Sequence, residues 1–485
     1  MSELFEHQKT GITFLEKKKK AILADEMGLG KTRQAILAAG KMTLVVCPAS
    51  LKINWKREIE MIYPENTIQV IDSKSDVYAE FDWFIINYDI LEKRIEQIEK
   101  LIEVGKIKTI VLDEAHYIKG KSIRATVVIG GKVKKKSTGE VRKFEGLANK
   151  VENVYCLTGT PLLNRPIELF NLLTAIGHPL GGYGKRSAFA RKFCGAFMRQ
   201  IFARGGRPIW IMDESGSSNL GELRGELDGW ILRRKKKEVL DLPEKIISVM
   251  ETEMSREAKK DYDNAWDNYI EFVKENPMPE QNIDNIILAR HLVEIQKLKQ
   301  VASRWKVNRM VEDIRNATEQ GEKVIVFSQY TKTIEMIAEE VRTGNKLNPG
   351  IKTVTLTGAD DMNERQLAVD SFQNEEDTKV FVGNIKAAGV GLNLTAASIV
   401  MFADLDWTPE THRQAEDRAH RIGQGGTVNV YYYVATGTIE EDIIAVLNKK
   451  KNVMDQILEG GKNRLGKFSS QEMFLRLMAK KANCG

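Results

Sequence analysis

Residues 21–32 have the sequence AILADEMGLGKT, a short apolar run followed by a glycine-containing turn that ends in lysine and threonine. A helical pattern follows directly, at residues 34–39. A strand, a glycine turn and a helix in this order are typical of a phosphate-binding loop, because glycine lets backbone N–H groups approach phosphate at the positive end of the helix. We therefore predict a nucleotide site formed by six consecutive residues: Met27, Gly28, Leu29, Gly30, Lys31 and Thr32.

Within this loop, Lys31 is predicted to contact the β- and γ-phosphates of the nucleotide, and Thr32 to hold Mg²⁺. The widespread form of the loop has a further glycine where Asp25 stands, so a chance glycine-rich turn is the alternative. The carboxylate pair Asp113 and Glu114, which follows another apolar run, weakens that alternative. We expect Asp113 to share Mg²⁺ with Thr32 and Glu114 to orient or deprotonate the attacking water. An N-cap cluster at a strand end is the structural alternative for this pair.

Short apolar runs, each followed by polar or glycine-rich residues and a helical pattern, recur along the chain. They are residues 21–24, 44–47, 83–86, 109–112, 154–157, 324–327, 353–356, 380–382, 399–402 and 428–434. Continuous rather than alternating apolar strands are typical of parallel sheets that are buried on both faces. Two such sets predict an α/β protein of two lobes, residues 1–241 and 242–485.

Further segments are expected to interrupt these lobes. We predict a basic insertion at 120–150 and a helical, basic protrusion at 165–232 in the first lobe, and a helical insertion at 255–320 and C-terminal helices at 439–480 in the second. In the basic insertion, apolar segments around a lysine-rich turn predict a β-hairpin with residues 127–131 in its first arm. Lys134 and Lys135 near its tip are candidate phosphate contacts. A solvated loop that touches nothing is the alternative.

Composition and charge limit the class of protein. The 485 residues are 42% hydrophobic and 29% charged, which is typical of a globular chain and not of a disordered or membrane-spanning one. The N-terminus has no secretory apolar core, and four widely spaced cysteines favour neither disulfides nor a zinc site. Residues 119–150 contain ten basic and two acidic residues, and residues 185–212 contain seven basic residues and no acid. Basic residues that are clustered in this way favour binding to a polyanionic partner.

A third candidate element lies far from the first two, in residues 414–421, QAEDRAHR. Arg418 and Arg421 are three residues apart, a spacing that places them on one face of a helix. We predict that Gln414, Arg418 and Arg421 are catalytic and that the arginines act on the γ-phosphate from the opposite lobe. A surface helix whose arginines pair with neighbouring acidic residues is the alternative.

Together these segments resemble the Swi/Snf-type ATPases of helicase superfamily two over nearly the whole chain. The matching segments are residues 4–15, 25–32, 46–51, 87–89, 157–161, 326–330, 389–409 and 418–424. The resemblance implies two RecA-like lobes, a P-loop NTPase helicase core with helical insertions. It also implies that His7 and Gln8 read adenine and that Gly391 belongs to the nucleotide site. Residues 215–223 and 232–240 are similar to the annealing-helicase, fork-remodelling subgroup, although none of that subgroup's substrate-recognition modules is matched.

The resemblance further implies a groove that follows a DNA backbone. The candidate contacts are Lys52, Trp55, Thr160, Ser328, Lys386 and Trp407. Core packing is the alternative for both tryptophans. Contacts of this kind are largely insensitive to sequence.

We predict an ATP- and Mg²⁺-dependent motor that moves along duplex or branched DNA, acts as a monomer and has no membrane association. It would lie in the bacterial or phage-infected cytoplasm with the nucleoid, or in a eukaryotic nucleus. A strand-separating helicase is the nearest alternative. A DNA-binding protein that uses ATP only as a switch is another, but such a protein would not need to retain Glu114.

Overall fold

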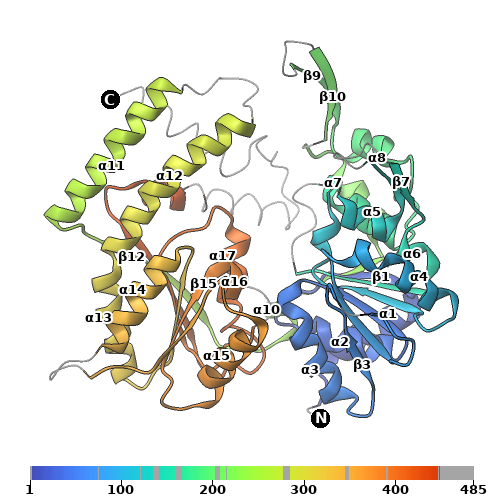
Figure 1. Cartoon of the computed structure of the whole chain (residues 1–485), viewed down its shortest axis with the longest axis horizontal. Coiled ribbons are helices and arrows are strands. Elements are labelled where there is room, and N and C mark those ends of the chain that lie inside the picture. The colour runs from blue at the N-terminus through green and yellow to red at the C-terminus, as the bar shows by residue number, and fades with distance from the viewer. Residues whose placement is uncertain are drawn as a thin grey trace. The chain divides into compact units, whose positions relative to one another are not determined.

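The computed structural model describes residues 3–74, 76–120, 122–134, 141–159, 166–202, 208–214, 216–276, 285–343, 349–388, 392–445 and 447. These residues form two compact units, one that ends at Asp241 and one that begins at Leu242. Figure 1 shows a parallel sheet with helices packed beside it in each unit. The predicted α/β class with two parallel-sheet lobes is confirmed.

Unit one is built on a seven-stranded parallel sheet with the order β11-β1-β8-β5-β2-β4-β3. Its strands are β1 (Lys20–Leu23), β2 (Thr43–Cys47), β3 (Ile68–Val70), β4 (Trp83–Asn87), β5 (Thr109–Leu112), β8 (Asn153–Leu157) and β11 (Ile231–Leu232). Every residue of β2, β4 and β5 is buried, which is why these strands are continuous apolar runs in the sequence. The strand that precedes the phosphate-binding loop, β1, lies between β11 and β8.

Ten α-helices accompany this sheet among the described residues of unit one. They are α1 (Glu6–Lys18), α2 (Lys31–Ala39), α3 (Lys52–Ile62), α4 (Ile95–Glu103), α5 (Ile123–Ile129), α6 (Leu147–Lys150), α7 (Pro166–Ala175), α8 (Arg186–Phe193), α9 (Leu220–Leu227) and α10 (Lys236–Val239). Short 3₁₀ turns lie at Ala49–Leu51, Leu91–Arg94 and Ala115–Ile118. Helix α4 buries Ile95, Ile98 and Leu101, which share one face at helical spacing.

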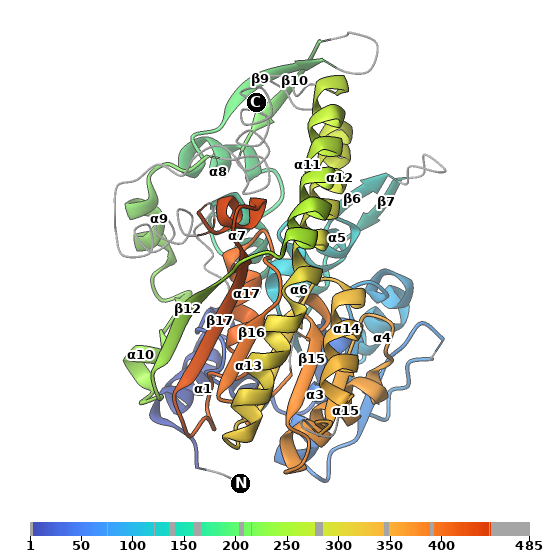
Figure 2. The same ribbon diagram turned by 90° about the vertical axis from the view of Figure 1, so that its left-hand side faces the viewer.

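Two antiparallel hairpins extend from unit one (Figure 2). One pairs β6 (Gly131–Lys134) with β7 (Val141–Phe144), and the other pairs β9 (Phe197–Phe202) with β10 (Pro208–Asp213). A hairpin in the basic insertion was expected, but residues 127–129 belong to α5 and not to its first arm. The Ser122 side chain caps that helix by accepting the Ala125 N–H at 3.2 Å, and Val127 and Val128 are buried in the core.

Unit two contains a six-stranded parallel sheet with the order β12-β17-β16-β13-β15-β14. Its strands are β12 (Lys245–Thr252), β13 (Val324–Ser328), β14 (Thr353–Leu356), β15 (Val380–Asn384), β16 (Ile399–Phe402) and β17 (Val428–Ala435). Five of the six follow the predicted apolar runs. The edge strand β12 was not predicted, because it is only partly buried and its sequence lacks a continuous apolar run.

The helices of unit two are α11 (Arg256–Glu275), α12 (Asn285–Trp305), α13 (Val307–Glu319), α14 (Thr331–Arg342), α15 (Met362–Asn374), α16 (Ile385–Ala388) and α17 (Pro409–Glu416). Helices α13 and α14 pack side by side (Figure 2). A buried ion pair, Lys306 Nζ to Glu440 at 2.7 Å, links the start of α13 to the segment after β17. Most of the predicted C-terminal helices, 439–480, lies outside the described residues. No described helix is long and apolar enough to cross a membrane.

Candidate nucleotide-binding site

The phosphate-binding loop connects β1 to α2 at the carboxyl edge of the unit-one sheet, where open α/β sheets bind ligands. Gly28 and Gly30 have φ values of 81° and 73°, which glycine adopts at little cost. At Gly30 a Cβ atom would lie 2.4 Å from Gln8 Nε2, so the end of the Gln8 side chain packs closely over this glycine. Lys31 is the first residue of α2, and its Nζ donates to the Asp25 carbonyl at 2.7 Å. Phosphate oxygens bound at this helix end would meet the same ammonium group.

The first turn of α1 packs against this loop. His7 and Gln8 are both buried, and a ring nitrogen of His7 hydrogen-bonds the Leu29 carbonyl at 3.2 Å. The close approach of Gln8 to Gly30 completes the contact. The structure therefore brings both predicted adenine-reading residues to the phosphate-binding loop, although they come from a separate helix.

Asp25 has a structural role that accounts for a carboxylate where the common loop has glycine. Its side chain is fully buried and accepts from Arg234 Nε at 2.9 Å and from the Arg234 backbone N–H at 3.1 Å. Arg234 also donates to the His7 carbonyl and, at 3.1 Å, to Gln34 Oε1. This network ties the loop to α1 and to the segment after β11. Arg234 was not predicted as a site residue, because it stands in a basic run that resembles a solvated surface.

Arg234→Met is expected to lower the free energy of unfolding by about 3–5 kcal/mol, since it leaves the buried Asp25 carboxylate without its partner. Urea denaturation followed by circular dichroism measures the change. Lys237→Met removes an exposed cation three residues away and serves as the control, with an effect within about 0.5 kcal/mol. A loss below 1 kcal/mol for Arg234→Met would show that this network is not what holds the loop.

The second predicted element, Asp113, lies directly after β5 and is buried. Its carboxylate accepts from Trp55 Nε1 at 2.7 Å and from the Glu114 N–H at 2.9 Å, while Tyr88 donates to its backbone carbonyl at 2.8 Å. Burial, with a further contribution from Glu114, raises the pKa of Asp113 to about 6, and the positive charge of Lys31 opposes that rise. A carboxylate buried in this way is stabilised by a cation, which fits the predicted metal-ligand role.

Glu114 has an unusual backbone conformation, with φ 47° and ψ 52°. A residue with a side chain pays roughly 1–3 kcal/mol for a sparsely populated conformation of this kind, so the surroundings must hold it. Its N–H is bonded to Asp113, its carbonyl accepts from Tyr117 N at 2.9 Å, and its carboxylate lies 3.2 Å from His116 Nδ1. These contacts hold Glu114 directly beside Asp113.

Four of the eight predicted DNA contacts are buried in the structure, so packing accounts for these side chains and their contact with DNA stays a prediction. Trp55 is fully buried and orients Asp113, and Lys52 is buried with Nζ donating to the Ile71 carbonyl at 3.1 Å. Burial lowers the pKa of Lys52. Ser328 is buried and donates to Asp404, and Trp407 is buried in a cluster of unit two. In the structure these four side chains pack and hydrogen-bond within their own units.

The remaining predicted residues divide between exposed and undescribed positions. Lys386 is largely exposed, with its Nζ 3.9 Å from an Asp406 carboxylate oxygen, so it stays a candidate DNA contact. Lys134 is the last residue of β6. Thr160, Lys135 and Gly391 lie outside the described residues.

In unit two, Arg418 and Arg421 do not share a helix face, because α17 ends at Glu416 and the arginines lie in the turns that follow. Both guanidinium groups nevertheless donate to the same carbonyl, that of Leu392, at 3.3 and 3.4 Å. The two charges therefore converge, as predicted, but through a loop and not through helical spacing. Gln414 lies in the last turn of α17. Glu416 pairs with Lys245 at 2.7 Å.

A buried lysine connects the helical segment of unit two to residues 404–407. Lys299 Nζ donates to the Leu405 carbonyl at 2.6 Å and lies 4.7 Å from the Trp407 ring centroid. Gln329, just after β13, donates to the same carbonyl at 2.6 Å. Sequence patterns did not indicate Lys299, because a lysine in a helix is normally exposed.

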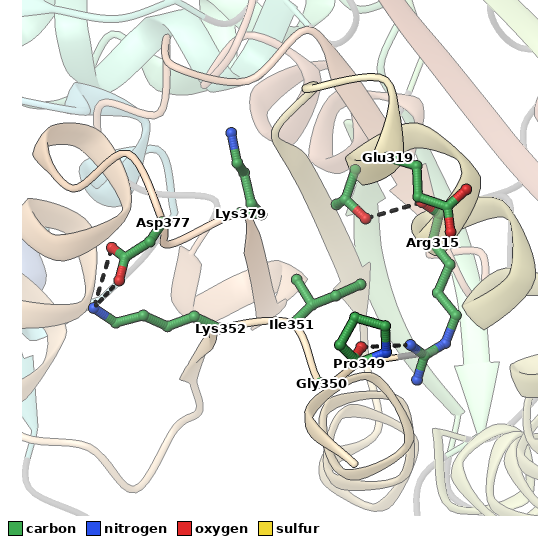
Figure 3. A pocket seen from close by; sticks show the side chains of 9 residues that line it. Arg315, Glu319, Pro349, Gly350, Ile351, Lys352, Asp377 and Lys379 are labelled. Atoms are coloured by element: carbon green, nitrogen blue, oxygen red, sulfur yellow. Dashed lines mark hydrogen bonds and ion pairs between the residues drawn. The ribbon is translucent and has the colours of Figure 1, made fainter. Parts of the chain in front are cut away.

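Figure 3 shows a cavity of about 260 Å³ at the opposite edge of the unit-two sheet, just before β14 and β15. Its basic side chains already have partners. Arg315 donates to the Pro349 carbonyl at 3.1 Å, and Lys352 bonds Asp377 and Glu375. This cavity lies away from the sheet edge that carries the predicted motifs, and it has no part in the nucleotide site.

The class of protein is defined by a glycine loop whose lysine begins a helix, a carboxylate pair directly after a central strand and a second parallel-sheet unit. It is a P-loop NTPase with two RecA-like lobes.

Comparison with known proteins gives the family. The SNF2-related domain matches residues 7–325, and the helicase conserved C-terminal domain matches residues 305–423. The chain belongs to the SNF2-related family of helicase superfamily two, as the order of its motifs predicts. Membership implies that the nucleotide is ATP.

Similar proteins cover nearly all of this chain. The DNA annealing helicase and endonuclease ZRANB3 of Bos taurus is 31% identical over 96% of this chain and 41% of its own length. The ATP-dependent helicase MG018 of Mycoplasma genitalium is 29% identical over 98% of this chain and 44% of its own. A solved SWI2/SNF2 ATPase core of Sulfolobus solfataricus in complex with dsDNA is 25% identical, with a TM-score of 0.40 and coverage of 95% and 94%. The chain spans about two fifths of the length of these curated relatives.

Proposed function

We propose that this protein is a DNA-stimulated ATPase that translocates along duplex or branched DNA. The observation that carries the proposal is the hydrolytic arrangement of unit one, where Lys31 begins the helix after the phosphate-binding loop, Asp113 is buried after β5 and a strained backbone holds Glu114 beside it. A protein that used ATP only as a switch would need the first two residues and not the third. Family membership supports the same conclusion.

Each residue of unit one has a distinct part in this reaction. Lys31 and the N–H groups at the start of α2 hold the β- and γ-phosphates, and His7 and Gln8 contact the adenine side of the nucleotide. Thr32 and Asp113 hold Mg²⁺, which neutralises phosphate charge. Trp55 fixes the Asp113 carboxylate through its N–H. Glu114 orients the attacking water and accepts its proton.

Unit two supplies the remaining charge. Arg418 and Arg421 converge on one carbonyl, so a single movement of this turn carries both guanidinium groups together. They act on the γ-phosphate when the two units close around ATP. Hydrolysis then depends on closure, and cycles of closing and opening advance the DNA.

The polyanion that this motor follows is DNA. Contacts with DNA phosphates are supported by the clusters of basic residues at 119–150 and 185–212 and by the exposed Lys386 of unit two. The relatives' names include annealing helicase, which supports remodelling of branched DNA as the outcome of translocation. The protein acts as a monomer in the compartment that holds the DNA.

The ATPase rate with no DNA, single-stranded, linear duplex and forked DNA tests this function. Duplex DNA is expected to stimulate turnover by at least tenfold. Stimulation by single-stranded DNA alone, together with separation of the strands of a forked duplex, would favour the strand-separating helicase instead. A rate that no DNA changes would overturn the proposal.

A further inference from the structure

The β9–β10 hairpin presents large apolar side chains to solvent. It projects beyond α8 in both views (Figures 1 and 2). Trp210 is 60% exposed, Met198 is 51% exposed and Phe197 is 49% exposed. In the register of the pair, Trp210 lies opposite Gln200 and Met212 lies opposite Met198, so these four side chains share one face of the ribbon. An isolated two-stranded ribbon has no second layer to cover such a face.

The base of the hairpin is held by contacts with the rest of unit one. Met212 packs against the core cluster of unit one. Just beyond β10, Glu214 accepts from Arg186 Nη2 at 2.8 Å and from Arg186 Nε at 3.2 Å. The arrangement fixes the ribbon to the start of α8 while Trp210 stays in solvent. Exposed apolar groups on a fixed support are typical of an interaction site.

The charge around these groups indicates what kind of partner they meet. Residues 185–212 contain seven basic residues and no acid, although residues 203–207 lie outside the described part of the chain. Among the described residues, Arg191 on α8 is exposed, whereas Arg199 lies on the ribbon face opposite to Trp210 and pairs with Asp213 at 3.9 Å. Flat apolar side chains next to basic side chains complement a ligand that has both flat apolar groups and negative charge.

Nucleic acid with unpaired bases has both properties. In a duplex the base faces are stacked and only the groove edges and phosphates are accessible, so an aromatic ring gains little there. Unpaired bases expose their faces and stack on tryptophan, with little dependence on sequence. A protein partner would be expected to carry acidic residues with apolar ones, and that alternative predicts unchanged fork affinity in the test below.

We propose that the β9–β10 hairpin binds unpaired DNA bases at junctions or single-stranded gaps, with Trp210 as the stacking platform and the exposed Arg191 of α8 on a neighbouring phosphate. This inference rests on the proposed function, because that function makes branched DNA a substrate of the motor. It adds a substrate-selecting contact that is separate from the nucleotide site.

The test compares the binding of forked DNA and linear duplex DNA by the full chain with substitutions at Trp210. Trp210→Ala is expected to weaken binding to forked DNA by roughly 5- to 150-fold. Its binding to linear duplex should stay within about twofold. Trp210→Phe keeps a ring and should retain most of the affinity, whereas Trp210→Leu keeps apolar surface without a π face and should behave like alanine. Tyr78→Ala removes another exposed aromatic of unit one and serves as the control.

The outcomes separate this inference from the proposed function. Unchanged fork affinity in Trp210→Ala would overturn the hairpin contact, even if duplex DNA still stimulates the ATPase. Wild-type affinity in Trp210→Leu would also overturn stacking, because an apolar side chain without a π face would then be sufficient. If duplex DNA fails to stimulate the unaltered chain, the proposed function itself fails. Equal loss on both DNAs would mean that Trp210 does not select unpaired bases.

Discussion

Glu114→Gln is expected to bind ATP within several-fold of the unaltered chain while its DNA-stimulated hydrolysis falls by at least about 100-fold. Glutamine keeps the size and hydrogen-bonding shape of the side chain but cannot accept the proton of the attacking water, a contribution of roughly 10²–10⁴ in rate. Glu114 acts on the water and not on the nucleotide, so the variant should remain closed on ATP and DNA. Steady-state turnover and the lifetime of the DNA complex with ATP measure both effects.

Two further variants place this result in context. Lys31→Ala removes the phosphate contact itself, so we expect ATP binding or hydrolysis to be lost and no trapped DNA complex to form. Glu152→Gln neutralises an exposed acid of the same unit and should hydrolyse ATP normally. Hydrolysis by Glu114→Gln at the unaltered rate with DNA present would show that the role assigned to Glu114 is wrong.

Arg421→Ala should change ATP affinity by no more than several-fold but lower DNA-stimulated turnover by roughly 10³ or more, as removal of an arginine finger does. The reason is that Arg421 belongs to unit two, whereas the groups that bind the phosphates belong to unit one. Arg418→Ala should have a similar effect, since both guanidinium groups donate to the Leu392 carbonyl. Turnover and nucleotide affinity, measured separately, distinguish loss of chemistry from loss of binding.

The shared carbonyl also suggests the competing explanation, which is that the arginines only hold the turn. Melting temperature without nucleotide distinguishes the two. Arg413→Ala is a matched control, because that arginine lies in α17 and pairs with Glu410 at 2.7 Å. A melting temperature lowered by several degrees in Arg421→Ala, with turnover reduced only in proportion to the folded fraction, would favour the structural role.

Much of the fold follows from the sequence because the central strands are buried on both faces. Runs such as residues 44–47 and 324–327 cannot be solvated on either side, so a parallel sheet is the arrangement that accommodates them. The same argument does not predict strand β12, because this strand lies at the edge of its sheet and is partly exposed. Residues 127–129 were expected in a strand because they are an apolar segment beside a lysine-rich turn, but they form the end of helix α5, with Val127 and Val128 buried in the core.

The candidate site was predictable where its chemistry is local. The glycine loop and the carboxylate pair each lie within one short segment. The residues that position them do not, because Trp55 is 58 residues from Asp113 and Arg234 is 209 residues from Asp25. No pattern along the chain reveals such partners, since the sheet order alone brings them together. The burial of Lys52, a predicted DNA contact, could not be predicted from the sequence for the same reason.

The central claim, that ATP hydrolysis drives movement along duplex DNA, is tested most directly by displacement of a triplex-forming third strand from a linear duplex. A translocating motor displaces the third strand without separating the duplex beneath it. We predict displacement that requires ATP and Mg²⁺, occurs with the unaltered chain and is absent with Lys31→Ala. Vigorous ATP hydrolysis on the same DNA with the third strand left in place would contradict the claim.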